Sequence, residues 1–349
     1  MHDRNTFGMK VKCRLLLELD SPQDLLSLDM ESLPQPVFVM GGGSNLLFLG
    51  DFPGTVIHPS FKSLTLQESP SGYPEGTVLV KVGAGIVFDD FCEWAADKGL
   101  WGAENLSLIP GEAGASAVQN IGAYGVEAND IIETVHVFDK NTRTFSDIPC
   151  GECAYGYRTS NFKTVWKGSF IVTAVTFRLS RVPAPKLDYG GVRSALAERY
   201  PSDAELTPSM IRETVISIRR KKLPDPSETG SAGSFFCNPV ISREHFLSIL
   251  EKERAEKGAD YMVPHYDVGE MVKVPAAWMI EQCGFKGVSH GGAQVYPKQP
   301  LVIVNSTGDA LPSEIVELER RVISAVNERY GIVLHPEVEH VGAIPSETK

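Results

Sequence analysis

Short apolar runs separated by glycine turns dominate the first half of the chain and predict β-strands. Residues 37–40 read VFVM and lead directly into a glycine run, after which residues 46–48 are apolar again. This order predicts a strand, a glycine turn and a second strand. Another strand is predicted over residues 78–82, VLVKV. The alternating segments 133–138 and 169–179 predict antiparallel strands, each with one face exposed to water.

Apolar residues at helical spacing predict helices in four places. The first helix has Asp89 as its N-cap and ends at Gly99. The second covers residues 209–220. In the last third of the chain, residues 275–283 open with a proline, and a longer helix runs from a serine cap over residues 313–330. A glycine follows each of these last two segments and predicts where the helix ends.

Two charged features lie at the ends of predicted elements. The basic run Arg219-Arg220-Lys221-Lys222 follows the second helix and is cut by the sequence LPDP. It is either a solvated helix end, where the helix dipole favours cations, or a clamp for a phosphorylated substrate. The strand-like run 332–338, IVLHPEV, carries a single carboxylate, Glu337.

Size and charge narrow the class of protein. A chain of 349 residues exceeds the usual reach of one hydrophobic core, so we expect two or three domains. Its formal net charge of −11 argues against generic binding to nucleic acid, which requires a broad basic face. No apolar stretch has the length of a signal peptide or of a membrane span. We therefore expect a cytoplasmic protein without a membrane partner.

Cysteine and histidine usage predicts neither disulfides nor a metal site. The six cysteines are scattered through the chain, unlike the framework of a small secreted domain, and are interpreted as reduced thiols. Cys150 and Cys153 form a CxxC, but no second pair follows at zinc-ribbon spacing, so we interpret the pair as coincidental. The eight histidines show no paired-ligand spacing.

The stretch 102–125, GAENLSLIPGEAGASAVQNIGAYG, differs from ordinary core and surface sequence. Half of it is Gly, Ala or Ser, and it contains neither Lys nor Arg. Glycine lets a ligand approach main-chain atoms, and successive amides or a helix N-terminus bind anions, so a pyrophosphate could be held here without side-chain cations. The alternative is two tight turns with a small-residue packing surface. A Rossmann fingerprint is not present, because the glycine runs at 41 and 83 both lack the final glycine of GxGxxG.

Seven motifs, taken together and in chain order, resemble one family, the UDP-N-acetylenolpyruvoylglucosamine reductases (MurB) of bacterial cell-wall synthesis. The resemblance covers nearly the whole chain, and Tyr189 within LDYGG is typical of the longer of the family's two structural types. The motifs are NTFG (5–8), GGGSN (41–45), IPGEAGASAVQNIGAYG (109–125), YRTSNFK (157–163), KLPDP (222–226), GSFFCNP (233–239) and HPEVE (335–339).

The resemblance implies an α+β fold with a two-lobed FAD-binding domain, of the vanillyl-alcohol-oxidase and MurB type, and a separate α/β substrate-binding domain. On this basis we expect residues 1–66, completed by 334–349, to form lobe 1, residues 67–222 lobe 2, and residues 223–333 the substrate-binding domain. The glycine-rich turns would hold FAD non-covalently. The flavin contacts carried over by motif position are Gly41, Gly42, Gly43, Ser44, Asn45, Gly111, Gly122, Ala123 and Tyr124.

The same resemblance implies a reaction that serves peptidoglycan synthesis, and with it cell shape and division. NADPH would reduce the flavin, and hydride from flavin N5 would then add to the enolpyruvyl CH₂ of UDP-N-acetylenolpyruvoylglucosamine, giving UDP-N-acetylmuramate. By motif position Arg158 and Glu337 would stabilise the enolate, and Ser234 would supply the proton. A guanidinium suits this task because it holds a carboxylate with two parallel hydrogen bonds. We expect Glu337 to be protonated, since a second anion would oppose an enolate.

From the residues alone, Arg158 and Glu337 would be surface charges and Ser234 a turn serine. The motifs further imply substrate contacts to the diphosphate and uracil from Tyr189, Lys222, Asn238 and Gln299, with Tyr189 on a closing loop. Cys237 is a departure, because members of the family often carry Lys there.

The implied partners are the UDP-sugar and NADPH, and the implied state is a monomer or weak oligomer. Two alternatives stay open. One is another FAD-dependent oxidase or dehydrogenase of the same fold, and the other is a non-catalytic nucleotide-sugar-binding protein.

Overall fold

The computed structural model describes residues 1–68 and 71–343, and the chain folds into two compact units. The first unit is discontinuous and consists of residues 1–11, 45–51 and everything from Lys222 onward. The second contains residues 12–44 and 52–221. The predicted division into two lobes and a substrate-binding domain stays a prediction, and residues 344–349 of its first lobe lie outside the described residues.

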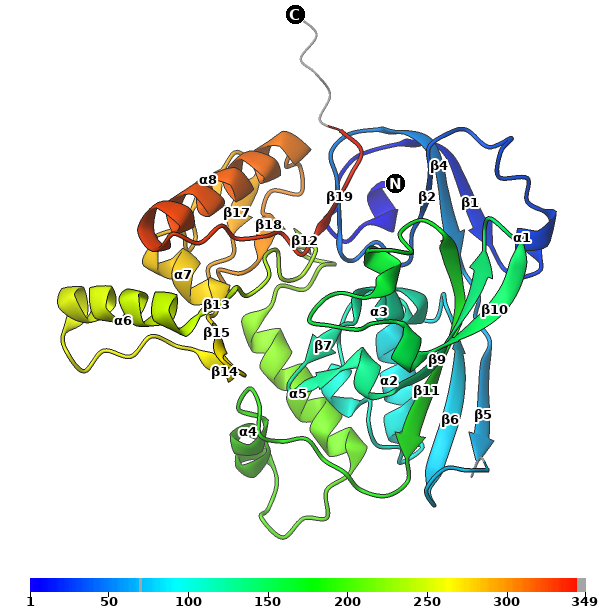
Figure 1. The fold of residues 1–349 in the computed structure, drawn as a ribbon, viewed down its shortest axis with the longest axis horizontal. Helices are drawn as coiled ribbons and strands as arrows, with labels where there is room; N and C mark the ends of the chain where they lie inside the picture. The colour runs from blue at the N-terminus through cyan, green and yellow to red at the C-terminus, as the bar shows by residue number, and fades with distance from the viewer. Residues whose placement is uncertain (69–70, 344–349) are drawn as a thin grey trace, which may run out of the picture. The chain divides into compact units, whose positions relative to one another are not determined.

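Two larger sheets form most of the second unit (Figure 1). A parallel sheet has the order β1-β4-β2, and an antiparallel sheet has the order β10-β9-β11-β6-β5. The strands are β1 (Cys13–Leu19), β2 (Val37–Val39), β4 (Phe52–Pro59), β5 (Leu64–Glu68), β6 (Thr77–Gly83), β9 (Ile132–Asp139), β10 (Thr144–Pro149) and β11 (Phe170–Ser180). Beside them lie the short pair β7 (Gly122–Ala123) and β8 (Val126–Glu127), and helices α1 (Asp24–Ser27), α2 (Phe88–Asp97), α3 (Ala113–Gln119), α4 (Val192–Arg199) and α5 (Pro208–Lys222).

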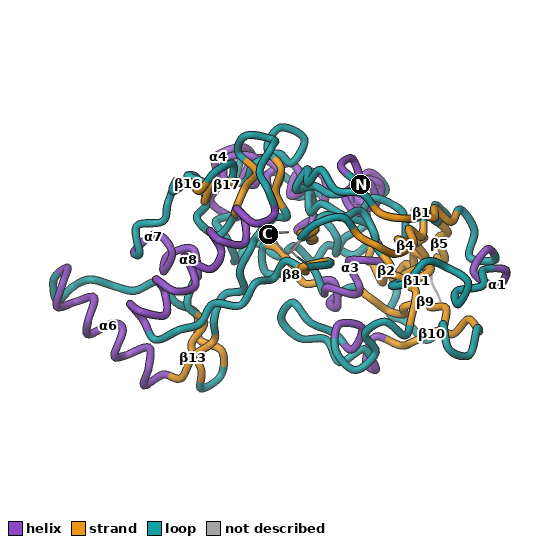
Figure 2. Tube along the Cα trace, turned by 90° about the horizontal axis from the view of Figure 1, so that it is seen from above, coloured by secondary structure: helices purple, strands orange, loops and turns teal. Residues whose placement is uncertain are grey.

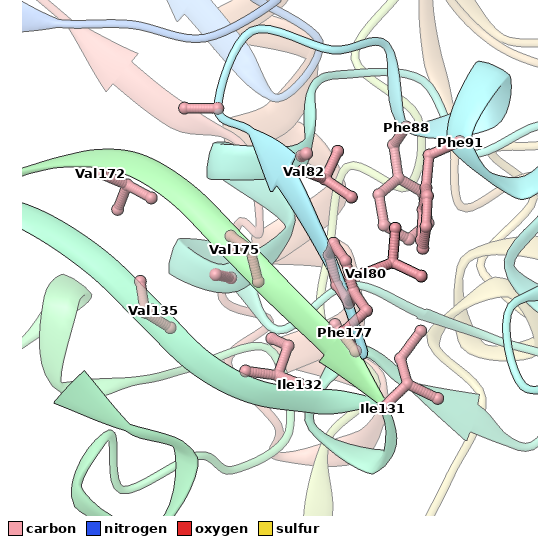
Figure 3. Close-up of a cluster of buried hydrophobic side chains, with 14 of the residues drawn as sticks. Val80, Val82, Phe88, Phe91, Ile131, Ile132, Val135, Val172, Val175 and Phe177 are labelled. Carbon is pink, nitrogen blue, oxygen red and sulfur yellow. The ribbon is translucent and has the colours of Figure 1, made fainter. Parts of the chain in front are cut away.

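The core of this unit is built where α2 meets the antiparallel sheet (Figure 3). Phe91 of α2 stacks on Phe177 of β11 with ring centroids 4.7 Å apart, and Phe88 meets the same ring edge-on. The prediction of one water-exposed face for β11 is wrong, because the consecutive residues Ile171–Val175 are all buried. Both α3 and β4 contact this strand, so its side chains are covered over most of its length.

The predicted helices are present, but two predicted N-caps are wrong. Helix α2 begins at Phe88, so Asp89 lies inside its first turn. The Asp89 carboxylate instead accepts the N–H of Leu108 at 2.6 Å and pairs with Arg212 of α5 at 3.1 Å. This acidic side chain therefore joins α2 to α5.

Helix α8 (Pro312–Tyr330) begins one residue before the predicted serine cap, with a proline as its first residue. The capping contact is made by Glu314, whose carboxylate accepts the N–H of Leu311 at 2.9 Å. The helix ends at Gly331, as predicted, and that glycine has the left-handed φ of 65° that favours this residue.

The first unit combines small sheets with three helices, of which α6 and α8 are visible as long purple segments in Figure 2. Its sheets have the orders β12-β18-β17-β16, β13-β15-β14 and β19-β3. The elements are β3 (Leu46–Phe48), β12 (Gly230–Ser231), β13 (Val240–Ser242), α6 (Arg243–Lys257), β14 (Tyr266–Val268), β15 (Met271–Lys273), α7 (Ala276–Gln282), β16 (Ser289–His290), β17 (Ala293–Val295), β18 (Ile303–Asn305), α8 and β19 (Glu339–Val341).

The strand predicted over residues 332–338 is wrong. Regular pairing begins only at β19, which runs parallel to β3. The preceding segment makes a single bridge, between Pro336 and Phe236. Proline has no N–H to donate to a ladder, so it interrupts a strand that the apolar pattern alone would continue.

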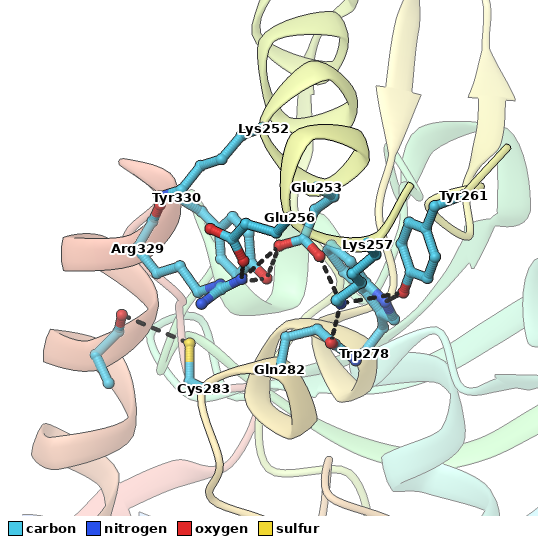
Figure 4. Close-up of polar contacts among 11 residues, drawn as sticks. Lys252, Glu253, Glu256, Lys257, Tyr261, Trp278, Gln282, Cys283, Arg329 and Tyr330 are labelled. Atoms are coloured by element: carbon cyan, nitrogen blue, oxygen red, sulfur yellow. Dashed lines mark hydrogen bonds and ion pairs between the residues drawn. The ribbon is translucent and has the colours of Figure 1, made fainter. Parts of the chain in front are cut away.

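A buried carboxylate joins the three helices of the first unit (Figure 4). Glu253 on α6 is fully buried and forms ion pairs with Lys257 at 2.6 Å and with Arg329 of α8 at 2.9 Å. It also accepts the hydroxyl of Tyr330 at 2.9 Å, while Lys257 reaches Gln282 of α7. Burial disfavours ionisation of Glu253, but these hydrogen bonds lower its pKa below the ordinary 4.5.

We predict that Glu253→Gln lowers the free energy of unfolding by about 3 kcal/mol, because it leaves two cations without their buried counter-charge. Urea unfolding followed by circular dichroism measures this. Since the folded pKa of Glu253 is depressed, its contribution is present above pH 4.5 and is lost at lower pH, so the difference between variant and wild type should shrink in acid. The control is Glu256→Gln, which removes a more exposed partner of Arg329 and should cost under about 1 kcal/mol. Equal losses in both variants would contradict the prediction.

Candidate functional site

Two of the predicted flavin-binding segments lie against each other in the second unit. The hydroxyl of Ser44 donates to the carbonyl of Pro110 at 3.1 Å. A Cβ placed on Gly42 would lie 3.4 Å from the Cα of Gly111, and one on Gly111 would lie 2.7 Å from the Ser44 hydroxyl. Gly111 also has a φ of 115°, which side chains rarely adopt. The two loops therefore approach each other in a way that only glycine allows.

The first two N–H groups of α3 are hydrogen-bonded within the protein and are not available to a ligand. The N–H groups of Ala113 and Gly114 donate to the carbonyls of Ile86 and Ala84 at 2.8 and 2.9 Å. A Cβ on Gly114 would meet Ala84 at 2.8 Å. At these positions the small-residue packing interpretation is right, and the anion-binding interpretation of the stretch is limited to its other amides.

Arg158 reaches the second part of the glycine-rich stretch. It lies in a tight turn in which Gly156 and Thr159 exchange backbone hydrogen bonds, and its own φ is 57°, a left-handed value unusual for a side-chain-bearing residue. Its guanidinium donates to the carbonyl of Gly122 at 2.9 Å. The arginine of the sequence motif YRTSNFK is thus hydrogen-bonded to β7, which consists of the predicted flavin residues Gly122 and Ala123. Strained backbone of this kind is typical of functional sites.

The structure also brings Tyr189, predicted to bind substrate, next to Tyr124, predicted to bind flavin. A Cβ on Gly190 would lie 2.7 Å from the Tyr124 ring, and one on Gly125 would lie 3.0 Å from Tyr189. Asn105 holds the two segments together, because its amide donates at 2.8 Å to the carbonyls of both Tyr124 and Lys186. Tyr124 and Tyr189 are 65 positions apart in the sequence, so no local pattern predicts that their segments are in contact.

Arg219 is a residue that the motif transfer missed. It lies on α5 near Tyr124 and Arg158, where burial lowers its pKa and the like charge of Arg158 acts in the same direction. Its Nε is buried and has no hydrogen-bond partner among residues 1–68 and 71–343. The signal was available, because Arg219 follows the buried Ile211 and Val215 at helical spacing and so lies on the inward face of α5. Two neighbouring cations and an unused buried donor suit an anionic ligand.

In the first unit, the segments that carry Ser234 and Glu337 are hydrogen-bonded to each other. The N–H of Glu337 donates to the carbonyl of Phe235 at 2.8 Å, and the N–H of Cys237 donates to His335 at 2.9 Å. Asn45 is bonded to the second of these segments, since its amide donates to the carbonyl of Glu337 at 3.1 Å. Both Ser234 and Glu337 are half-buried. The predicted catalytic residues thus divide between the units, with Arg158 in the second.

The remaining predicted substrate residues occupy different elements of the first unit. Lys222 is exposed at the end of α5. The side-chain oxygen of Asn238 accepts the N–H of Ala276 at 2.9 Å, so this residue also fixes the start of α7. Gln299 is half-buried in a turn, in which its N–H donates to the carbonyl of Tyr296 at 3.2 Å.

The cysteines are reduced, and the two of the CxxC pair have raised pKa values. All six are free thiols, as predicted. Burial raises the pKa of Cys153 to about 11 and also raises that of Cys150, so neither is a reactive thiolate at neutral pH. Within the described part of the chain, no group of three or more His, Cys, Asp or Glu residues could hold a metal ion. No helix in that part is long and apolar enough to cross a membrane.

Comparison with known proteins decides the family. The chain is 42% identical over 341 residues to the UDP-N-acetylenolpyruvoylglucosamine reductase of Bacteroides fragilis, and the match covers 97% of each protein. The chain belongs to the UDP-N-acetylenolpyruvoylglucosamine reductase family. Another member, from Porphyromonas gingivalis, is 40% identical over 97% of this chain and 96% of its own length. The model of this family's C-terminal domain matches residues 225–341, and that of an FAD binding domain matches residues 29–146.

Among solved structures, the fold is similar to that of the MurB family member from Thermus caldophilus, with a TM-score of 0.64 at 24% sequence identity. The match covers 98% of this chain and 97% of that one. The expected α+β fold with an FAD-binding domain is therefore confirmed.

The residues of the second unit fit FAD. The FAD binding domain match contains both glycine loops and β7. The backbones of the loops come close at Gly42 and Gly111, and a side chain on Gly111 would displace the Ser44 hydroxyl. The unused buried donor of Arg219 beside Tyr124 offers a further anchor for an anion. The chain is thus an FAD-dependent oxidoreductase of its family, as the motifs predicted.

Proposed function

We propose that the chain catalyses the NADPH-dependent reduction of UDP-N-acetylenolpyruvoylglucosamine to UDP-N-acetylmuramate, a step of peptidoglycan precursor synthesis. The observation that carries this proposal is the sequence identity of 42% and 40%, over nearly the full length, with reductases named for that substrate. When bound, FAD supplies the hydride chemistry between NADPH and the enolpyruvyl group. The residues of the chain must then hold the substrate, absorb negative charge and deliver a proton.

Arg158 stabilises the negative charge that develops when hydride adds to the enolpyruvyl CH₂. An enol ether is electron-rich, so addition requires the charge to move into the adjacent carboxylate. The backbone turn and the bond to Gly122 fix the Arg158 guanidinium in the second unit. Its planar donors can hold the carboxylate with two parallel hydrogen bonds. Burial and the like charge of Arg158 both lower the pKa of Arg219, and Arg219 is a second positive charge available to the same anion or to a phosphate.

Ser234 donates a proton to the carbon next to the substrate carboxylate, and Glu337 supports the enolate. Their hydrogen-bonded segments keep the two residues in one part of the first unit. Gly233, directly before Ser234, has a φ of 72°, a left-handed value that favours glycine at this turn. A hydroxyl is a weak acid in water, which is why neighbouring polar support is required.

The UDP part of the substrate contacts Tyr189, Lys222, Asn238 and Gln299. Lys222 is exposed and supplies a point charge for phosphate. Tyr189 is 43% exposed and its segment packs against that of Tyr124, a position suited to closing over a sugar near the flavin. The protein works in the cytoplasm, without nucleic acid or membrane partners, as a monomer or weak oligomer.

Spectroscopy tests the function directly. We expect the purified protein to be yellow, to bleach when NADPH is added without oxygen, and to regain its colour when UDP-N-acetylenolpyruvoylglucosamine follows. A protein that bleaches but is reoxidised only by oxygen would instead be another flavoenzyme of this fold. A colourless protein that binds the sugar would be a non-catalytic binder. Either result would contradict the proposal.

A further inference from the structure

A buried histidine–carboxylate pair lies beneath the glycine loops. His58 is on β4, and its Nε2 is 3.0 Å from both carboxylate oxygens of Glu112. Its Nδ1 is 3.2 Å from Glu18 of β1. The side chains of His58 and Glu112 are only 9% and 8% exposed, whereas that of Glu18 is 41% exposed. The pair therefore lies inside the unit, and Glu18 lies at its edge.

This pair connects to both loops of the flavin site. Glu112 directly follows Gly111, and its Oε2 would be 3.4 Å from a Cβ on Gly41. Next to His58 on β4, the carbonyl of Ile57 accepts the N–H of Met40, the residue that precedes the first loop. One strand thus holds the start of one loop through its backbone and the other loop through the His58 ring.

We propose that His58 and Glu112 are positioning residues for FAD, in which protonated His58 fixes the glycine loops and offsets a carboxylate that would otherwise repel the FAD pyrophosphate. The inference rests on the flavin site assigned above. A carboxylate in the loop that carries Gly111 opposes a bound diphosphate unless a cation is adjacent. Neither residue needs to touch the cofactor, since both act through the loops.

The charge of His58 depends on few neighbours. The hydrogen bond to Glu112 raises its pKa above 6.5, burial opposes this, and Glu18 adds to the increase. Neither β2, the loop at 41–44 nor α3 carries a titratable side chain. The charged residue on β11, Arg178, is paired with Glu133. Because the folded pKa is raised, the charged pair is present at and below pH 6.5 and is lost as pH rises through the folded pKa.

The test is the dissociation constant of FAD, measured by quenching of flavin fluorescence on titration with apoprotein from pH 6 to pH 9. Binding of the diphosphate should favour protonated His58, so the wild-type constant should rise about tenfold across this range, the change that one unit of coupled pKa produces. No sugar enters these titrations, so failure of the substrate assignment would leave them unchanged.

Two variants separate charge from structure. Glu112→Gln keeps an acceptor for His58 but removes the charge, so its FAD affinity should be as tight at pH 9 as that of the wild type at pH 6. His58→Gln should bind about tenfold more weakly at pH 6, without a pH dependence. Glu18→Gln is the matched control, because it changes the partner of the other ring nitrogen, and it should keep most of the pH dependence of FAD binding. If Glu112→Gln retains the wild-type slope, or if wild-type binding does not vary with pH, the proposal is wrong. Circular dichroism of each apoprotein verifies folding.

Discussion

Replacing Ser234 by Ala should slow reoxidation of the reduced flavin by the enolpyruvyl sugar by about 10²–10⁴-fold, the usual contribution of a positioned acid. Reduction by NADPH should stay within about twofold of wild type, because that half-reaction needs no proton from this hydroxyl. The expected result is therefore a selective loss. Anaerobic stopped-flow spectroscopy of the two half-reactions, followed through flavin absorbance, measures both rates separately.

The control for this variant is Ser306→Ala, which removes an exposed serine of the same unit whose hydroxyl donates to Gly292 at 2.9 Å. Both half-reactions should be unaffected in it. An equal loss in the two half-reactions of Ser234→Ala would show that the serine supports folding or flavin binding rather than proton transfer. Unchanged reoxidation would remove Ser234 from the mechanism.

The sequence predicted the elements whose signals are local. The order of strand, glycine turn and strand over residues 37–48 is confirmed, since short apolar runs flanked by glycine leave few alternatives. The same holds for α7 and the end of α8. The strands on either side of the first glycine turn nevertheless belong to different units, because β2 pairs with β4 whereas β3 pairs with β19. Pairing partners so far apart in the chain are not encoded in either segment alone.

Two of the wrong predictions share a physical cause, which is competition between local preference and tertiary contacts. Asp89 is a residue type that favours the N-cap position, but its carboxylate bonds to Leu108 and Arg212 instead. The central strand β11 alternates in sequence, yet its polar Thr173 is buried and donates to the carbonyl of His136. A buried hydroxyl is tolerated where it has a hydrogen-bond partner. The alternation of apolar and polar residues along a strand contains no information about such a partner.

For the site, motif position predicted the residues and the structure supplied their relations. YRTSNFK and the glycine stretch are separate in the sequence, but Arg158 bonds to Gly122. Arg219 and His58 were absent from the predicted site because neither belongs to a glycine or catalytic motif. Helical spacing could have placed Arg219 on the inward face of α5, but its neighbour Arg158, like Glu112 beside His58, lies on another element.

Replacing Arg158 by Lys should lower turnover of the enolpyruvyl sugar on the order of a hundredfold or more, although the positive charge is kept. Lysine provides a point charge and cannot hold a carboxylate with two parallel hydrogen bonds. Steady-state kinetics should show the loss mainly in kcat, because the two parallel hydrogen bonds matter most as charge develops on the substrate. The flavin spectrum and the midpoint of thermal unfolding should stay near wild type. The control is Arg178→Lys in the same unit, where an exposed arginine pairs with Glu133 at 3.3 Å and turnover should not change. If Arg158→Lys turns over at the wild-type rate, the charge on the enolate is carried by another group, and Arg219 becomes the first candidate.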